Sequence, residues 1–440
     1  MIKTVKFGGS SLADAAQFKK AADIVKSEKE RLFVVPSAPG KRFKGDTKVT
    51  DMLYRCYALA EDDRDYTKAL DAIRARYDEI VKGLKVKVDL DSEFQAIDTN
   101  FRLKKGGDYA ASRGEYLNSV IMAAVLKRPF VDAAEIILFD EKGNFDSERT
   151  NDTARAKLKP LKEGAVIPGF YGSLPDGTVH TFSRGGSDIT GSIVSRAVMA
   201  DVYENWTDVS GFLVADPNII DNPVRIDTIT YRELRELSYM GAGVLHEEAV
   251  FPVRREGIPV NIRNTNDPSN PGTWIVESTC QKSEYIITGI AGKKGFCAVN
   301  VDKDLMNSEV GFGRRVLQAF EDNGINFEHM PSGIDTMTVF VHQSEFMSHE
   351  QRVVAEIHRL ADPDSIEIES DLALIAVVGR GMKSTRGTAG RIFSALAHAS
   401  VNVKMIDQGS SELNIIIGVK NDDFEAAIRA IYDIFVMTRI

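Results

Sequence analysis

The chain has 440 residues, 43% of them hydrophobic, so it is long enough to form two or three domains with sizeable cores. Its 64 acidic side chains outnumber 55 basic ones, and the formal net charge is -9. No block of basic residues stands out beyond KRFK at 41–44, so nucleic acid is not expected as a partner. No apolar run approaches the roughly 20 residues that span a membrane. The first residues have the alternating pattern of a β-strand rather than the pattern of a signal peptide.

We therefore expect no membrane partner and a cytoplasmic location. The three cysteines, Cys56, Cys280 and Cys297, lack the paired spacing of a disulfide framework or a zinc site. This pattern is typical of reduced thiols.

The first element is KFGGSS at 6–11. Alternating apolar residues predict a strand before it, and the apolar spacing from Leu12 to Val25 predicts a helix behind it. Gly8 and Gly9 lack a Cβ, so backbone N–H groups can approach phosphate oxygens, and Lys6 adds a positive charge. Because the full P-loop pattern is absent, a phosphate cradle and an ordinary tight turn both remain open.

Strand and helix patterns alternate as far as about residue 280. The strands are predicted over 32–35, 134–138, 165–167, 202–206 and 259–262, and the helices over 52–59, 116–126 and 189–199. The alternation predicts an α/β domain with a largely parallel sheet and helices on both faces, with ligands at the carboxyl ends of the strands. Residues 64–105 interrupt it with a charged, mostly helical segment, which we interpret as a solvated face.

A second glycine pair occurs in SRGGSD at 183–188, between a predicted strand at 179–182 and a helix predicted to begin at Asp188. Arg184 can bind a carboxylate through two hydrogen bonds. Asp188 is either a functional acid or a plain N-cap.

Further polar side chains follow predicted strands or begin helices. Thr207, Asp208 and Asp216 lie after the strand that ends in Trp206, where a doubly wound sheet would bind a nucleotide, although loop aspartates are also common turn formers. Ser37, Thr50 and Glu115 are placed where they can face a substrate.

The sequence after the polar joint at 264–272 contains an internal repeat. Residues 311–341 align with 387–417 at a constant offset of 76 residues, without a gap. Each copy is predicted to fold as strand, helix, strand, strand, helix, which indicates a duplicated ferredoxin-like α+β module. The first copy ends with a strand at 365–369, and the second ends after a helix at 422–435. The strand pattern at 284–290 is therefore predicted to complete the second module, with the first inserted inside it.

Together, KFGGSS, VVPSA, SRGE, RGGSD, WTDVSG, the DP pair and MGAGVLH, in this order and spacing, resemble the aspartate kinases of the amino acid kinase family. The repeat resembles the paired ACT modules that regulate those kinases. The resemblance covers nearly the whole chain and implies a kinase domain over 1–283, ACT module 1 over 284–370 and ACT module 2 over 371–440. It also implies ATP-dependent formation of 4-phospho-L-aspartate from L-aspartate, the first step of lysine, threonine and methionine biosynthesis, under feedback control.

The resemblance further implies a set of site residues. Lys6 and Asp188 would be catalytic, with Asp188 orienting Lys6 or the waters of Mg²⁺, and the protein itself would supply no metal ligand. Glu115 suits an α-ammonium and Arg184 a carboxylate, and the attacking β-carboxylate is already ionised at pH 7. ATP would contact Lys6, Phe7, Gly8, Gly9, Ser10, Thr207, Asp208, Leu213, Asp216, Asn218, Gly243 and Val244. L-Aspartate would contact Ser37, Thr50, Glu115, Arg184, Gly185, Gly186 and Ser187.

Two positions depart from the family pattern, because relatives usually carry lysine at Gly243 and arginine at Asn218. Arg254, Arg255 or the 41–44 stretch are candidate replacements. Two alternative functions stay open: a catalytically degenerate amino-acid sensor, and a related kinase acting on another substrate such as glutamate, acetylglutamate or UMP.

The turn before the first repeat helix is the predicted effector site, because backbone N–H groups at a helix N-terminus can receive a carboxylate. Its residues are Met306, Glu309, Gly311, Phe312 and Asp335. Two acids favour lysine over threonine as the effector. The resemblance implies a homodimer or homotetramer that assembles through the ACT modules.

Overall fold

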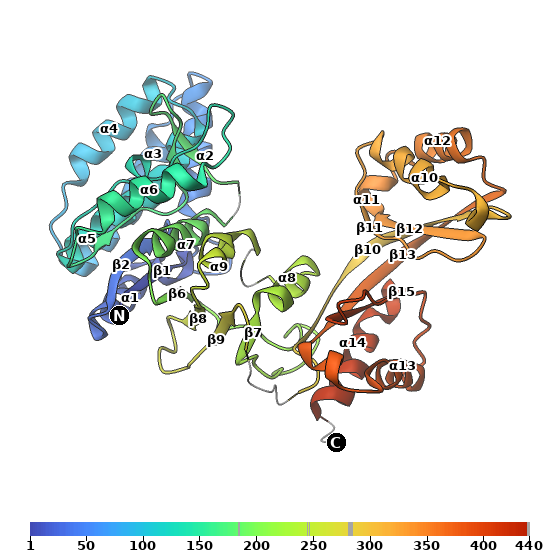
Figure 1. The fold of residues 1–440 in the computed structure, drawn as a ribbon. Helices are drawn as coiled ribbons and strands as arrows, with labels where there is room; N and C mark the ends of the chain where they lie inside the picture. Colours follow the sequence, from blue (N-terminus) through green and yellow to red (C-terminus); the bar gives the residue numbers. More distant parts are fainter. Residues whose placement is uncertain (184, 244, 246, 280–284, 438–440) are drawn as a thin grey trace. The chain divides into compact units, whose positions relative to one another are not determined.

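The computed structural model describes the chain except residues 184, 244, 246, 280–284 and 438–440 (Figure 1). The chain forms two compact units. The first comprises Met1–Phe212, Asp227–Tyr231 and Gly243–Thr279, and the second comprises Leu213–Ile226, Arg232–Ala242 and Cys280–Ile440. Among the helices that the structure describes, none is long and apolar enough to cross a membrane.

The first unit contains a seven-stranded sheet with the order β3-β2-β1-β6-β8-β9-β7. The strands from β3 to β8 run parallel, and β9 is antiparallel to β8. This confirms the predicted largely parallel sheet. The strands are β1 (Lys3–Phe7), β2 (Arg31–Pro36), β3 (Ala165–Val166), β6 (Val202–Thr207), β7 (Thr228–Thr230), β8 (Val260–Asn264) and β9 (Thr273–Val276).

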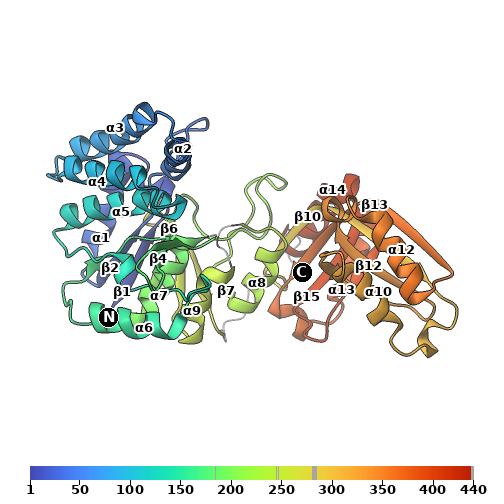
Figure 2. The same cartoon turned by 90° about the horizontal axis from the view of Figure 1, so that it is seen from above.

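Helices cover both faces of this sheet, as Figure 2 shows. Alternate residues of β2 point to opposite faces, so Val34 belongs to one apolar core and Phe33 and Val35 to the other. On one face lie α1 (Ala15–Ser27), α2 (Val49–Glu61), α3 (Thr67–Leu84), α4 (Leu90–Arg102) and α5 (Gly107–Leu126). On the other lie α6 (Ser147–Leu158), α7 (Gly186–Val198) and α9 (Phe251–Arg255).

One prediction for this unit was wrong. Residues 134–138 do not form a strand, because Asp132 accepts a hydrogen bond from the Ala134 N–H and starts a 3₁₀ turn, η2 (Ala133–Glu135). The segment 64–105 is mostly helical, as predicted, and most of its charged side chains are exposed, but Arg76 is buried on α3. A short hairpin of β4 (Tyr171–Ser173) and β5 (Val179–Thr181) precedes α7.

The second unit contains a six-stranded antiparallel sheet with the order β11-β12-β10-β13-β15-β14. The strands are β10 (Gly289–Asp302), β11 (Phe327–His329), β12 (Thr336–His342), β13 (Ser365–Val378), β14 (Met405–Asp407) and β15 (Asn414–Lys420). The helices are α10 (Phe312–Glu321), α11 (Gln343–Phe346), α12 (Glu350–Ala361), α13 (Thr388–His398) and α14 (Phe424–Tyr432). α8 (Tyr231–Tyr239) falls mostly in this unit.

The two long strands β10 and β13 pair along their whole length. Gly289 pairs with Val378 and Asp302 pairs with Ser365, with a register shift around Gly295, whose φ is 92°. The strand predicted over 365–369 is therefore the first part of one continuous 14-residue strand. β10 begins at Gly289, and residue 284, where the predicted strand starts, lies outside the described residues. The domain boundaries stay a prediction.

Candidate active site

Lys6 lies near the carboxyl end of β1, in the middle of the parallel sheet, and only 7% of it is exposed. Its Nζ lies 2.6 Å from Oδ1 of Asp188 and donates a hydrogen bond of 3.4 Å to Oδ1 of Asn205. Asn205, which is paired with Lys6 across β1 and β6, donates from Nδ2 to the same Asp188 oxygen at 2.7 Å. Two strands and one helix thus fix the ammonium group in one place.

Asp188 is not the N-cap of α7. The helix begins two residues earlier, at Gly186, because Gly185 adopts the left-handed conformation (φ 59°) as its N-cap. Gly186 itself has no room for a side chain, since a Cβ there would lie 2.6 Å from the Phe170 ring. Asp188 therefore occupies the first helical turn, where its carboxylate contacts Lys6 and Asn205.

The first glycine turn passes over the Lys6 ammonium. The Gly8 N–H donates to the Trp206 carbonyl at 2.9 Å, and a Cβ on Gly8 would lie 3.7 Å from Lys6 Nζ and 3.9 Å from Thr207 Oγ1. A 3₁₀ helix, η1 (Gly9–Leu12), follows the glycines, and the predicted helix is α1, which begins at Ala15 because Asp14 caps it and accepts from the Gln17 N–H. The Lys6 ammonium thus lies beside this turn, and the N-terminus of α1 does not adjoin the glycines.

Glu115 projects from α5 and is 6% exposed. Its Oε2 is buried and has no hydrogen-bond partner among the described residues. Burial away from water raises the pKa of Glu115 to about 8, although the Ala38 N–H and the charge of Lys6 act in the opposite direction. Thr50 lies beside the preceding residue, since a Cβ on Gly114 would lie 3.8 Å from Thr50 Oγ1. A buried acceptor of this kind can receive an ammonium group.

The loop after β2 contacts the same region. The Ser37 N–H donates to the Phe7 carbonyl at 3.0 Å, and the Ser37 carbonyl accepts from Nδ2 of Asn118 at 2.7 Å. The sequence reasoning missed Asn118 and Asn205. The helical spacing of three between Glu115 and Asn118, and the strand position of Asn205 before Thr207, are the signals that could have found them.

Further predicted site residues fall outside the described residues, belong to the second unit or lie at the surface of the first unit. Arg184 and Val244 fall outside the described residues, and Leu213, Asp216 and Asn218 belong to the second unit. There, Oδ1 of Asp216 accepts from the backbone N–H and from Nδ2 of Asn218, both at 2.8 Å, which is the turn-forming role left open above. Leu213 lines an open pocket with Pro217, Asp221, Asn222 and Pro223. Gly243 is exposed in the first unit.

Most of the cations that could replace the lysine and arginine of relatives already form ion pairs with acidic side chains. Arg254 lies 3.5 Å from Glu277, and Arg42 of the 41–44 stretch lies 2.9 Å from Asp46. Arg255 contacts Glu148, which also contacts Arg196. Arg196 lies in the last turn of α7, two turns beyond Asp188.

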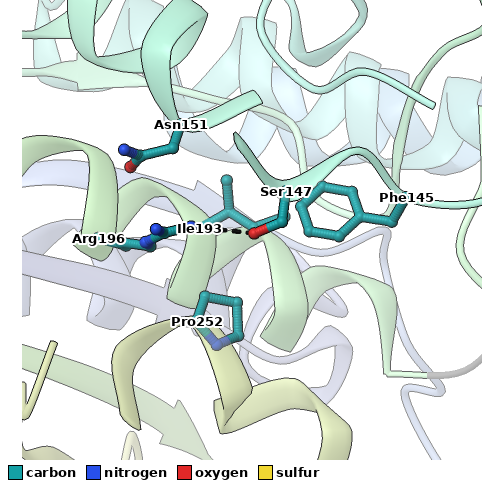
Figure 3. Close-up of a pocket in the computed structure, with 6 residues that line it drawn as sticks. All are labelled: Phe145, Ser147, Asn151, Ile193, Arg196 and Pro252. Carbon is teal, nitrogen blue, oxygen red and sulfur yellow. Dashed lines mark hydrogen bonds between the residues drawn. The ribbon is translucent and has the colours of Figure 1, made fainter. Parts of the chain in front are cut away.

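Figure 3 shows the small pocket at that end of α7, lined by Phe145, Ser147, Asn151, Ile193, Arg196 and Pro252. Arg196 donates to Ser147 there at 2.9 Å. Arg255 therefore lies near the C-terminal end of α7, whereas Asp188 contacts Lys6 near the N-terminal end of that helix.

Comparisons with known proteins agree with this fold. The model of the amino acid kinase family matches residues 1–264, and an ACT domain model matches residues 375–435. Aspartokinase 3 of Bacillus subtilis is 40% identical over 454 residues, covering 99% of this chain and 98% of that protein. The crystal structure of Clostridium acetobutylicum aspartate kinase superposes with a TM-score of 0.90 at 50% identity, covering 99% of both chains. E. coli aspartokinase III, solved with lysine and aspartate, gives 0.73 at 25% identity, covering 98% of this chain and 99% of that one.

The parallel sheet, the two glycine turns and the family match together define a phosphotransferase: the chain belongs to the amino acid kinase family. Within that family, these full-length relatives are aspartokinases, and the match near the C-terminus is to the ACT domain.

Proposed function

We propose that this protein transfers the γ-phosphoryl group of ATP to the β-carboxylate of L-aspartate, giving ADP and 4-phospho-L-aspartate. The bond between the γ-phosphorus and the bridging oxygen of ATP breaks, and a carboxylate oxygen of aspartate bonds to the same phosphorus. The observation that carries the proposal is the ammonium of Lys6, fixed by Asp188 and Asn205 under the Gly8 turn, together with the unpartnered acid of Glu115. The 40% and 50% identities to aspartokinases support aspartate as the acceptor.

Lys6 would neutralise charge on the transferring phosphoryl group. Phosphoryl transfer depends on positioning and charge neutralisation more than on covalent catalysis. Asp188 and Asn205 hold the ammonium while Gly9 and Ser10 would offer backbone N–H groups to the phosphates. The Gly8 N–H donates to Trp206, so Gly8 would contribute by letting the phosphates approach closely. Phe7, Thr207, Asp208, Leu213, Asp216, Asn218, Gly243 and Val244 remain the proposed nucleotide contacts.

Glu115 would bind the α-ammonium of aspartate, because a buried carboxylate gains most from an opposite charge. Arg184 would bind a substrate carboxylate, with Ser37, Thr50, Gly185, Gly186 and Ser187 beside it. This orientation leaves the β-carboxylate free to attack.

Mg²⁺ accompanies ATP in this proposal and supplies further charge neutralisation. In the part of the chain that the structure describes, no three acidic, histidine or cysteine side chains cluster as metal ligands. Such a site fits an ion carried mainly by the nucleotide's phosphates and by water. Asp188, held by Asn205, is the acid that would face it.

An end-product amino acid would regulate the enzyme, with lysine favoured because the E. coli relative was solved with lysine. The proposed residues Met306, Glu309, Gly311, Phe312 and Asp335 lie around η4 (Met306–Ser308) and the start of α10. Both acids already have partners: Glu309 contacts Arg315, and Asp335 accepts from the Leu305 N–H at 3.0 Å. Lysine would have to replace these contacts, and a homodimer or homotetramer would transmit its effect.

Hydroxylamine trapping of the acyl phosphate tests the proposal. Purified protein is incubated with ATP, Mg²⁺ and, in separate reactions, L-aspartate, L-glutamate, N-acetyl-L-glutamate and UMP. We expect a hydroxamate with aspartate and none with the other two carboxylates, and no ADP formation with UMP. Amino-acid binding without turnover of any substrate would contradict the proposal and support a sensor.

A further inference from the structure

Arg76 and Tyr77, consecutive residues of α3, reach from the charged helical segment towards the candidate active site. They are 5% and 0% exposed, in contrast to Asp71, Asp78 and Glu79 on the same helix, which face solvent. A buried arginine is unusual unless its guanidinium is fully engaged.

The Arg76 guanidinium connects two segments, the end of η1 and the loop after β2. Its Nη2 donates to the carbonyl of Ala13 at 3.3 Å and to the carbonyl of Gly40 at 3.1 Å. Its Nη1 lies 3.1 Å from Oδ2 of Asp46, which belongs to the loop between Gly40 and α2. Hydrogen bonds from Arg42 hold the pKa of Asp46 well below its usual range, so this acid stays ionised opposite Arg76.

Both segments contain proposed substrate contacts. The Gly40 N–H donates to the Gly9 carbonyl at 2.8 Å, and a Cβ on Gly40 would lie 2.5 Å from the Gly9 carbonyl carbon and 2.7 Å from the Ser10 nitrogen. The loop after β2, which starts at Ser37, is thus packed directly on the first glycine turn. Arg76 joins the two at their meeting point.

Tyr77 reaches a third segment. Its hydroxyl donates to the Gly114 carbonyl at 2.9 Å, one residue before Glu115. The ring is fully buried among α-helices of the same face and packs against Phe94. Tyr77 therefore fixes the part of α5 that presents the unpartnered carboxylate.

We propose that Arg76 and Tyr77 are positioning residues that hold the first glycine turn, the Ser37–Gly40 loop and Glu115 in one reactive geometry. The inference rests on the proposed function, because the three segments would bind the phosphates and the amino acid. Arg76 sets the distance between the glycine turn, which would bind ATP, and the Ser37–Gly40 loop, which would contact aspartate. Tyr77 sets the position of Glu115, which would bind the α-ammonium of aspartate. Displacements of about 1 Å in such a geometry cost on the order of a hundredfold in rate.

The first test compares Arg76→Met with Arg74→Met in steady-state kinetics. Arg74 lies on the same helix but contacts Asp78 and Asp91, away from the glycine turn. We expect kcat to fall by about tenfold or more for Arg76→Met, with smaller changes in both KM values, and to stay within about twofold for Arg74→Met. Arg76→Lys keeps a cation opposite Asp46 but cannot bridge both carbonyls, so we expect an intermediate kcat.

The second test compares Tyr77→Phe with Tyr66→Phe. Both substitutions remove one hydroxyl and keep the ring, and Tyr66 donates instead to Asp98 on α4. We expect Tyr77→Phe to raise the KM for aspartate about fivefold or more while leaving the KM for ATP nearly unchanged. Tyr66→Phe should change neither constant.

Melting temperatures of the Arg76 and Tyr77 variants distinguish a role in positioning the site from a role in stability alone. The kinetics of each variant are measured well below its melting temperature. A lower melting temperature with wild-type kcat and KM in Arg76→Lys and Tyr77→Phe would overturn the inference, even if Arg76→Met fails to fold. Wild-type protein that forms no acyl phosphate would instead overturn the proposed function.

Discussion

Lys6 is the residue on which the proposed chemistry most depends. Lys6→Ala removes the cation under the glycine turn but leaves Asp188 hydrogen-bonded to Asn205, so the fold should persist. We expect turnover to fall by about a hundredfold or more, because groups that stabilise the developing charge contribute roughly 3 kcal/mol or more to such transition states.

Lys19→Ala, an exposed position on α1, is the matched control and should behave as wild type. Circular dichroism confirms that both variants fold. Activity of Lys6→Ala within about threefold of wild type, roughly 0.7 kcal/mol, would remove Lys6 from the mechanism.

Glu115 gives a prediction about pH. Its pKa is raised from 4.5 to about 8 in the folded chain, chiefly by burial, so the folded state keeps a proton that the unfolded state releases. Because the unfolded state binds fewer protons across this window, the stability of the ligand-free protein falls as pH rises from about 4.5 to 8. As pH rises from about 4.5 to 8, the melting temperature of wild type should therefore fall relative to that of Glu115→Gln. At pH 8 the variant should be more stable, relative to wild type, than it is at pH 4.5.

Lys6, Tyr54 and Tyr77 are titratable groups that interact with Glu115, and all three are present in both proteins of the comparison. An ammonium ligand favours the ionised carboxylate, so aspartate should reduce the divergence at pH 8. A melting-temperature difference that does not vary with pH would show that Glu115 is ionised throughout.

At the scale of elements, the two loops after β1 and β2 are in close contact. Gly40→Ala would place a methyl group 2.5 Å from the Gly9 backbone, which cannot move without shifting the turn over Lys6. We expect kcat to fall by about tenfold or more, together with a loss of roughly 1–3 kcal/mol in the free energy of unfolding.

Gly45→Ala in the same loop is the control, because a Cβ there would meet only Phe43, at 4.0 Å. Chemical denaturation and steady-state kinetics measure both effects. Wild-type kinetics in Gly40→Ala would show that the contact between the loops does not position the glycine turn.

Most elements of the parallel sheet could be predicted from sequence because buried strands are short apolar runs bounded by turns. β2, β6 and β8 lie within about two residues of their predicted limits. The strand prediction for 134–138 was wrong because the apolar residues of this segment are buried in a turn and loop rather than in a strand. Hydrophobic periodicity does not distinguish a buried strand from a buried turn.

The candidate site was only partly predictable. Gly-Gly turns and the residues beside them are local signals, so Lys6 and Asp188 could be identified as site residues. Asn205, Asn118 and Arg76 bond to partners that lie 17, 81 and 30 residues away along the chain. Spacing can mark a residue such as Asn118 or Asn205 as a candidate, but a single sequence does not identify the distant partner.

At the scale of the whole molecule, regulation requires that an effector prefer one arrangement of the protein over another. The copies of the repeat differ at the proposed site, since KSTRG at 383–387 in the second copy has no acid. We expect lysine to inhibit wild type and to inhibit a Glu309→Ala, Asp335→Ala double variant far more weakly, by at least about tenfold in half-maximal concentration.

Titration of lysine and of threonine into both proteins measures this, with Glu321→Ala, Asp322→Ala at the end of α10 as the control pair. Equal inhibition of the double variant and wild type would remove this site. Inhibition by threonine alone would refute the choice of effector.

The central claim is that the β-carboxylate of L-aspartate receives the phosphoryl group. The most direct measurement is borohydride reduction of the product formed from ATP and ¹³C-labelled L-aspartate, followed by identification of the resulting alcohol. Reduction of a β-acyl phosphate gives homoserine, whereas an α-acyl phosphate gives 3-amino-4-hydroxybutanoate. The account predicts labelled homoserine from wild type and almost none from Lys6→Ala. Labelled 3-amino-4-hydroxybutanoate, or no labelled alcohol from wild-type protein, would contradict it.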